Sequence, residues 1–223
     1  VCSSDLLDYT PEQIVCSNGA KQSVCNVIMA LAGPGDEVIV PAPYWVSYPQ
    51  MVTLADAKTV IVSAGIEQDF KITPQQLEET ITPNTRILVL CSPSNPTGSV
   101  YTKEELAALA EVVAKHENLY VVADEIYEHI NYIGHHESIA QFDAIKDRVV
   151  IVNGVSKGYA MTGWRIGYTA SNAQIAKVMS NYLSHSTSAP SSVSQWAAVE
   201  ALEIKEISNV NYVDNRTVTA TAS

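Results

Sequence analysis

Three short loops contain most of the side chains in this sequence that could bind or transform a small molecule. They span residues 92–98, 124–127 and 153–157, and each follows an apolar, strand-like run. Loops after the carboxyl ends of parallel strands are where such sheets hold ligands. Together with a later arginine, the loops offer groups that can pair with a charge or hydrogen-bond a small anion. These residues are Asn95, Asp124, Tyr127, Ser156, Lys157 and Arg165.

None of these side chains identifies a reaction by itself. An aspartate after an apolar strand commonly caps a turn, a single lysine is commonly solvated, and a single arginine commonly forms a surface ion pair. The histidines His129, His135 and His136 lack a carboxylate or cysteine pattern that would complete a metal site, so we expect no bound metal. The amino-acid sequences of the motifs, and the order in which the motifs occur, carry more information than any single residue.

Alternating helical and strand-like patterns must position these loops. Apolar periodicity and capping residues predict helices over 20–32, 45–54, 73–81, 102–116, 172–185 and 192–204. Short β-branched runs predict strands over 37–41, 58–62, 86–91, 119–123, 149–152 and 165–170. This alternation predicts an α/β fold of three layers, with a mainly parallel sheet flanked by helices. A nicotinamide-binding Rossmann domain is the rival fold, but no GxGxxG motif follows a strand.

Composition limits the classes of partner. The 223 residues are 47% hydrophobic and carry a net charge of −11, so we expect a soluble chain that does not bind nucleic acid. No apolar stretch approaches the roughly 20 residues that a membrane helix needs, and the first residues lack the pattern of a secretory signal. The four cysteines form no CxxC pair, which favours a reducing, cytoplasmic location.

Five separated motifs occur together in a characteristic order. SPSNPTG spans residues 92–98, DEIY spans 124–127, and the pair Ser156-Lys157 precedes Arg165 by eight positions. With NGAKQ at 18–22 and PAPYWVSYP at 41–49, the sequence resembles the fold-type I, class I/II aminotransferases over roughly 7–202. The last two motifs resemble the branch of bacterial and plant-type aspartate and prephenate aminotransferases.

The resemblance implies pyridoxal 5′-phosphate as cofactor, with Lys157 as the residue that forms a Schiff base with it and moves the substrate proton. Lysine suits this role because its amine loses its charge readily when desolvated near other cations. Asp124 would pair with the ring nitrogen; at about 4 Å and an effective dielectric of about 20, such a pair gains ~4 kcal/mol before desolvation costs. Tyr127 and Asn95 would hydrogen-bond the phenolic oxygen of the cofactor.

The resemblance also assigns residues to the remaining parts of the site. Trp45 would stack on the cofactor ring, although ordinary core packing is the alternative for this residue. The phosphate would bind Arg165, Ser156 and the backbone amides of Gly19-Ala20 at a helix N-terminus. Lys21 would contact the distal carboxylate of an acidic substrate, the alternative being an exposed first-turn lysine. With Lys21, the residues implied to contact substrate are Trp45 and Asn95.

The activity implied is a ping-pong exchange of amino and oxo groups between an acidic amino acid, of the aspartate, glutamate or prephenate type, and a 2-oxo acid. A β-lyase or synthase on the same scaffold is one alternative, and a non-catalytic truncated cofactor-binding domain is another. Family members form homodimers, and we expect the same of the intact enzyme.

Both ends of the sequence depart from the family pattern. Residues 1–6 are interpreted as a non-native leader, 7–203 as an incomplete cofactor-binding large domain, and 204–223 as a divergent tail with little stable packing. The sequon that begins at Asn215 is interpreted as chance. Because the small C-terminal domain with its substrate-binding arginine has no counterpart, we expect the fragment itself to be inactive.

Overall fold

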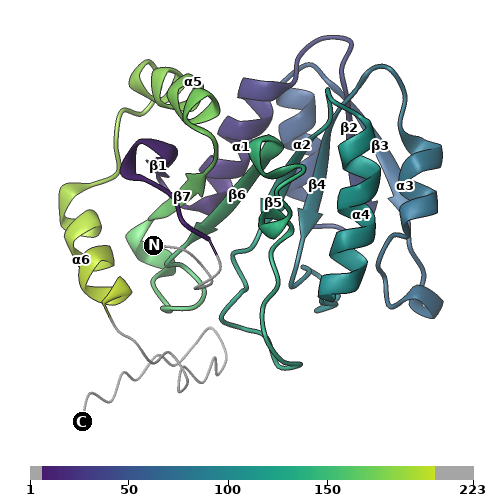
Figure 1. The fold of residues 1–223 in the computed structure, drawn as a ribbon. Coiled ribbons are helices and arrows are strands. Elements are labelled where there is room, and N and C mark those ends of the chain that lie inside the picture. Colours follow the sequence, from purple (N-terminus) through teal and green to yellow (C-terminus); the bar gives the residue numbers. More distant parts are fainter. Residues whose placement is uncertain (1–6, 204–223) are drawn as a thin grey trace.

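The computed structural model describes residues 7–203, which fold around a seven-stranded sheet (Figure 1). The strands are β1 (Ile14–Ser17), β2 (Glu37–Ala42), β3 (Lys58–Ser63), β4 (Thr85–Cys91), β5 (Tyr120–Asp124), β6 (Val149–Gly154) and β7 (Gly167–Ala170). The α-helices are α1 (Ala20–Leu31), α2 (Ser47–Leu54), α3 (Pro74–Thr80), α4 (Lys103–Lys115), α5 (Ala173–Ser184) and α6 (Ser192–Leu202). The leader, tail and sequon interpretations concern residues outside those described.

The strand order is β1-β7-β6-β5-β4-β2-β3, and the central pairings are parallel. β7 runs antiparallel to β6, and β1 runs antiparallel to β7. The prediction of a mainly parallel α/β sheet is therefore confirmed. Because β4, β5 and β6 are parallel neighbours, their carboxyl ends lie together at one edge of the sheet, where the three polar loops begin.

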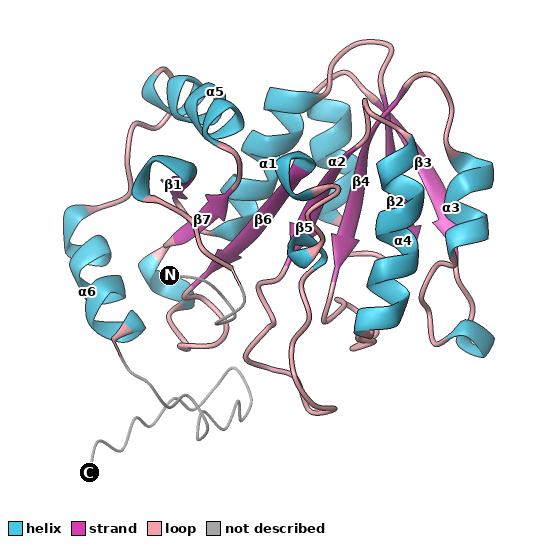
Figure 2. Cartoon of the chain, viewed as in Figure 1, coloured by secondary structure: helices cyan, strands magenta, loops and turns pink. Residues whose placement is uncertain are grey.

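Helices cover both faces of the sheet, as the cartoon in Figure 2 shows. One apolar cluster joins the sheet to α1, α2 and α5, and a second joins it to α3 and α4. The period of two along a strand separates them: Val38 and Val40 of β2 belong to the first cluster and Ile39 to the second. Burial of each such side chain stabilises the fold by about 1.5–3 kcal/mol. The three-layer prediction is thus confirmed.

Two helix starts follow directly from local sequence. Thr102 accepts a hydrogen bond from the Glu105 amide at 3.3 Å, while the Glu105 carboxylate accepts one from the Thr102 amide at 2.8 Å. This capping box fixes the start of α4, as predicted. Thr73 and Gln76 form the same arrangement ahead of α3, with Pro74 at the first helical position.

One strand was missed, and several predicted boundaries of strands and helices are wrong, for identifiable reasons. Strand β1 was not predicted, because its four residues show no clear alternation and gain their order from pairing with β7. Strand β5 extends to Asp124, so this carboxylate stands on the strand rather than in the loop. Arg165 is not in a strand: its φ of 55° is left-handed, and β7 begins at Gly167. Helix α2 begins at Ser47, two residues after the predicted start.

Helix α6 places large apolar side chains in solvent. Trp196 is 73% exposed and Val193 is 69% exposed, whereas Ala198 and Ala201 are buried.

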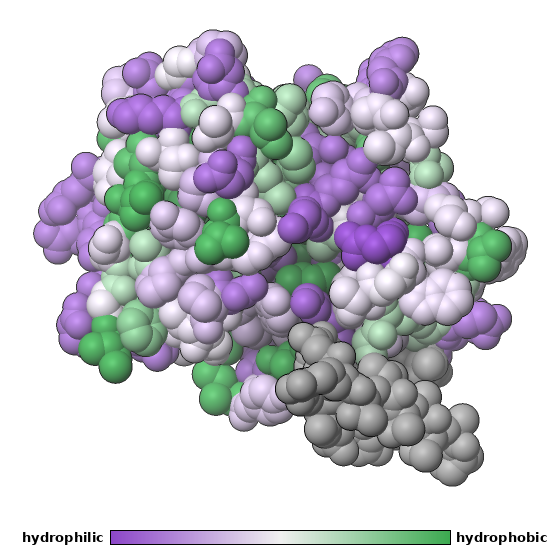
Figure 3. Space-filling view, turned by 180° about the vertical axis from the view of Figure 1, so that it is seen from behind, coloured by the Kyte–Doolittle hydropathy of each residue, from purple (hydrophilic) through white to green (hydrophobic). Residues whose placement is uncertain are grey.

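On the face turned away from the view of Figure 1, apolar residues are scattered among polar ones (Figure 3). Within residues 7–203, no helix is both long enough and apolar enough to cross a bilayer.

Candidate active site

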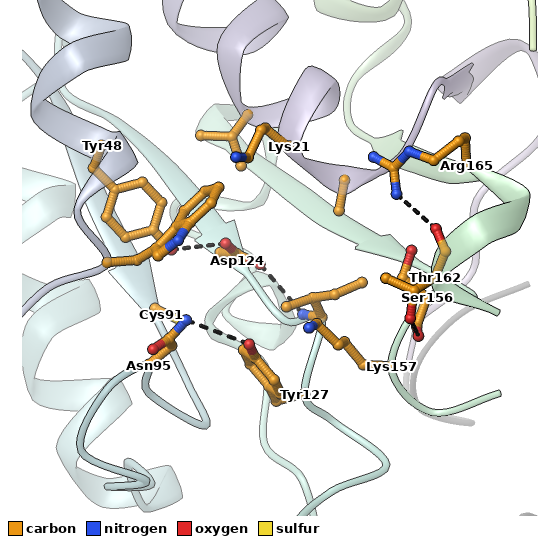
Figure 4. A pocket seen from close by; sticks show the side chains of 14 residues that line it. Lys21, Tyr48, Cys91, Asn95, Asp124, Tyr127, Ser156, Lys157, Thr162 and Arg165 are labelled. Atoms are coloured by element: carbon orange, nitrogen blue, oxygen red, sulfur yellow. Dashed lines mark hydrogen bonds between the residues drawn. The ribbon is translucent and has the colours of Figure 1, made fainter. Parts of the chain in front are cut away.

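A pocket opens at the carboxyl edge of β4, β5 and β6, beside the N-terminal ends of α1 and α2 (Figure 4). Nine of the ten predicted site residues line it, and the tenth, Gly19, adjoins it through Ala20. The lining residues are Ala20, Lys21, Val24, Trp45, Tyr48, Cys91, Asn95, Asp124, Ile126, Tyr127, Ser156, Lys157, Thr162 and Arg165. Residues separated by more than 100 positions therefore meet in one cavity.

Asp124 is a buried carboxylate at the end of β5, held by two donors. Tyr48 Oη donates to its Oδ2 at 2.7 Å, and the amide of Ile126 donates to its Oδ1 at 3.3 Å. Burial raises the pKa of Asp124, while these two hydrogen bonds and the charge of Lys157 oppose the rise. The carboxylate therefore has a fixed orientation and a strong electrostatic preference for a cationic partner.

Lys157 follows β6, and its amine faces the same cavity as Asp124 (Figure 4). Its Nζ lies 5.6 Å from the ring centre of Tyr127. Asn95 Nδ2 in turn donates to Tyr127 Oη at 3.3 Å. The loops after β4, β5 and β6 thus each supply one of these three side chains, as the strand-end argument predicted.

Arg165 stands at the other end of the pocket, where its guanidinium is held by backbone carbonyls. Its Nη1 donates to Thr162 O at 2.9 Å, and its Nη2 donates to Asn18 O at 3.1 Å. The left-handed backbone at Arg165 follows a 3-10 turn, Thr162–Trp164. The two bonds fix a cation beside the start of α1, where the helix dipole also favours an anion.

Two glycines allow this end of the pocket to form. Gly19 has a φ of +88°, and a Cβ there would lie 2.1 Å from Arg165 Nη2. A Cβ on Gly167 would lie 2.2 Å from the amide nitrogen of Ala20. A side chain at Gly19 would displace the guanidinium of Arg165, and a side chain at Gly167 would push β7 away from the start of α1.

Trp45 forms one wall of the pocket. Its ring meets that of Tyr48 edge to face with centroids 5.4 Å apart. Lys21 Nζ lies 4.9 Å from the Trp45 centroid, a cation–π contact that holds the amine at the pocket. Trp45 also packs against the apolar cluster of α1, α2 and α5, and Lys21 is an exposed residue in the first turn of α1, so the ligand-binding roles of both residues stay predictions.

Sequence reasoning assigned no role to Tyr48 and Cys91, although both line the pocket. Burial raises the pKa of Tyr48 well above its ordinary value, so its phenol stays a neutral donor to Asp124. Burial likewise raises the pKa of the Cys91 thiol to about 12. The position of Tyr48 three residues after Trp45, close to one helical turn, was the available signal.

No side chain fits at Gly154. A Cβ there would lie 2.7 Å from the carbonyl oxygen of Ile166 and 2.8 Å from Gly167 Cα. With the present backbone, the close approach of β6 and β7 therefore excludes any residue other than glycine at this position.

The histidines near the pocket pair with carboxylates rather than with one another. His129 Nε2 lies 3.1 Å from Glu128, and His136 Nε2 lies 3.1 Å from Glu125. Within residues 7–203, no cluster of three or more histidine, cysteine, aspartate or glutamate side chains could hold a metal ion.

Comparison with known proteins gives consistent similarities. The family profile described as aminotransferase class I and II matches residues 3–218. The chain is 52% identical over 197 residues to a bifunctional aspartate aminotransferase and glutamate/aspartate-prephenate aminotransferase of Petunia hybrida, covering 88% of this chain and 41% of the relative. It is 50% identical over 198 residues to the aspartate/prephenate aminotransferase of Cereibacter sphaeroides, covering 88% of this chain and 50% of the relative.

Solved structures give the same picture. The aspartate aminotransferase from Rhizobium meliloti superposes with a TM-score of 0.86 at 44% identity, over 88% of this chain and 50% of that protein. The aspartate aminotransferase from Thermus thermophilus with maleate superposes with a TM-score of 0.85 at 45% identity, over 88% of this chain and 51% of that protein. The chain therefore spans about half, or less, of the length of these relatives.

Proposed function

Because this chain belongs to the aminotransferase class I and II family, we propose that the protein transfers an amino group between an acidic amino acid and a 2-oxo acid, with pyridoxal 5′-phosphate as cofactor. The observation that carries the proposal is that the buried carboxylate of Asp124 and the amine of Lys157 line one pocket. These two groups suit a cofactor that has a basic ring nitrogen and an aldehyde.

The residues present fit such a cofactor at both ends of the pocket. At one end, burial raises the pKa of Asp124, so a cationic ring nitrogen beside it would stabilise the ionised form. At the other end, the cradle between Gly19 and Arg165 has no room for a Cβ but offers a guanidinium and helix-start amides to a phosphate. Ser156 adds a hydroxyl there, and the ring of Trp45 supplies an aromatic wall.

Each residue of the pocket has a definable task in this proposal. When bound, pyridoxal 5′-phosphate supplies an electron sink for negative charge at the carbon next to the substrate amine. Lys157 would hold the cofactor through its aldehyde carbon, and its Nζ, once displaced by the substrate amine, would accept the proton of the substrate carbon and return it. Tyr127 and Asn95 would hydrogen-bond the phenolic oxygen. Asp124, held by Tyr48, would keep the ring nitrogen protonated.

The position of Lys21 supports the proposal of an acidic substrate. Its amine stands at the pocket against Trp45, where a second carboxylate of a dicarboxylic acid could pair with it. The relatives from Petunia hybrida and Cereibacter sphaeroides are named for aspartate and prephenate, which are both acids with more than one charge-bearing group. We assign aspartate, glutamate or prephenate-type acids to this protein on these grounds, and homodimeric assembly in the cytosol from the family resemblance.

The substrate proposal is tested by amino exchange in the full-length protein. Wild type should transfer the amino group of aspartate and glutamate to a 2-oxo acid, and it should release no pyruvate from an amino acid that carries a leaving group on its β carbon. Lys21→Ala should lower kcat/KM for these substrates by about tenfold, the effect of losing one partly solvated charge pair of about 1.4 kcal/mol. An apolar amino acid serves as the matched control, because its kcat/KM should change little. Equal losses for acidic and apolar substrates would contradict the role of Lys21.

A further inference from the structure

A buried acid–histidine pair stands next to Asp124 in the chain. Glu125 is 3% exposed, and its carboxylate accepts a hydrogen bond from Ser138 Oγ at 2.5 Å. His136 is 6% exposed, and its Nε2 lies 3.1 Å from the other carboxylate oxygen of Glu125, off the line of a good hydrogen bond. Because both groups are buried, loss of one charge would leave the other uncompensated at high cost.

The ionisable groups that act on His136 are carboxylates. Glu125 contacts its ring, and Glu128 and Glu137 lie close enough to add their charge. Burial opposes the charged form of His136, but the close contact with the Glu125 carboxylate, together with the charges of Glu128 and Glu137, outweighs it and raises the pKa of His136. Glu128 is itself buried and pairs with His129 Nε2 at 3.1 Å.

The Glu125–His136 pair joins the two ends of the segment that carries Tyr127. The amide of Glu125 donates to Val152 O of β6 at 2.9 Å, and the amide of Glu128 donates to Glu125 O at 3.0 Å. The Glu125 side chain then reaches Ser138 and His136 at the far end of the same segment. Tyr127 therefore stands on a turn tied by backbone to β6 and by side chains to residues 136–138.

The charge of Glu125 also reaches the pocket. It is one of the influences that raise the pKa of Asp124, after burial. A positive charge on His136 would offset this influence of Glu125, although His136 is not among the residues that line the pocket.

We propose that His136 is a positioning residue of the pocket: its positive charge balances the buried Glu125 carboxylate and so holds the turn carrying Asp124 and Tyr127 in the geometry that takes the cofactor. This inference rests on the proposed function for its effect on cofactor binding. The charge pair itself is a property of the chain and can be measured without cofactor.

The sign of the pH dependence follows from the raised pKa of His136. The stabilisation is complete below the unfolded pKa of histidine, about 6.5, and is lost as the pH rises through the higher folded value. Cofactor affinity and the melting temperature of wild type should therefore fall as the pH rises through the pKa of His136.

The test compares His136→Gln, Glu125→Gln and the double variant in the full-length protein. His136→Gln should bind pyridoxal 5′-phosphate about tenfold more weakly at acidic to neutral pH and should lack the alkaline step. Adding Glu125→Gln should restore affinity, because it removes the unpaired charge and leaves an amide oxygen for Ser138. His116→Gln is the matched control: its Nε2 lies 3.0 Å from Glu78 on the surface, where such pairs contribute little.

Two results would overturn the proposal: an alkaline step that persists in His136→Gln, or a double variant that binds as weakly as the single one. If His136→Gln does not fold, folding of the double variant supports the charge pair, and its failure contradicts it. The melting temperature of the cofactor-free proteins against pH gives an independent readout. Should no variant bind cofactor, the proposed function fails, while the pH profiles of melting still decide whether the pair exists.

Discussion

Two donors orient Asp124, and the shorter of the two hydrogen bonds comes from Tyr48. Its hydroxyl lies 2.7 Å from the carboxylate and is itself buried, so water cannot replace it readily. A hydrogen bond to a charged group contributes about 1.5–3 kcal/mol. Tyr48 therefore stabilises the ionised form of Asp124 that the cofactor proposal needs.

Tyr48→Phe should weaken binding of pyridoxal 5′-phosphate by about tenfold. Without the phenol the pKa of Asp124 rises further, because one of the influences that lower it is removed. Affinity for pyridoxal 5′-phosphate depends on ionised Asp124, so it is present above the pKa of this carboxyl and is lost as the pH falls through that pKa. In Tyr48→Phe, the loss of affinity on the acid side should therefore occur at higher pH than in wild type. Titration of cofactor absorbance across acidic pH measures the shift.

Tyr182→Phe, on α5 and 38% exposed, is the control for removal of a phenol, and it should leave the profile unchanged. An acid limb at the same pH in Tyr48→Phe and wild type would contradict the role of Tyr48.

The residues of the site differ in how far sequence reveals them. The sequences and order of the motifs predicted that Asn95, Asp124 and Lys157 lie near one another. In the structure, all three line one pocket. Their roles stay predictions. Tyr48 and the Glu125–His136 pair were missed, because their contacts depend on how α2 and the 125–138 segment pack in three dimensions.

At the scale of elements, Arg148 joins the end of α4 to the start of β5. Its Nη1 donates to three carbonyl oxygens, those of Val113 at 3.0 Å, His116 at 2.6 Å and Leu119 at 3.0 Å. The carbonyls of Val113 and His116 also accept backbone hydrogen bonds, from the amides of His116 and Leu119, so the guanidinium adds a charged donor to the turn between α4 and β5.

Arg148→Met should lower the free energy of unfolding by roughly 2–3 kcal/mol, because it removes charged donors from these carbonyls. Urea denaturation monitored by circular dichroism measures the change. Lys115→Met is the matched control: its surface pair with Glu78, at 3.1 Å, should contribute less than about 1 kcal/mol. Equal stability of Arg148→Met and wild type would contradict the anchoring role.

Sequence patterns predicted elements best where the local signal agrees with the packing. The capping boxes of α3 and α4 and the apolar run of β6 are examples. Strand β1 and the left-handed Arg165 were not predicted, because each takes its conformation from partners distant in the chain: β7 for the strand, and Asn18 for the guanidinium.

At the scale of the whole molecule, the sheet brings together groups that are far apart in sequence. Parallel pairing of β4, β5 and β6 places Asn95, Asp124 and Lys157 at one edge, and antiparallel β7 brings Arg165 to the start of α1. The fold class was predictable because alternating helices and strands leave few other arrangements.

The most direct test of the central claim is covalent trapping of pyridoxal 5′-phosphate in the full-length protein with borohydride, followed by peptide mass spectrometry. The account predicts a stoichiometric adduct on Lys157, absent in Lys157→Ala and strongly reduced in Asp124→Asn at limiting cofactor. An adduct on another lysine, or undiminished trapping after loss of the Asp124 charge, would contradict the convergence of these two groups on one cofactor.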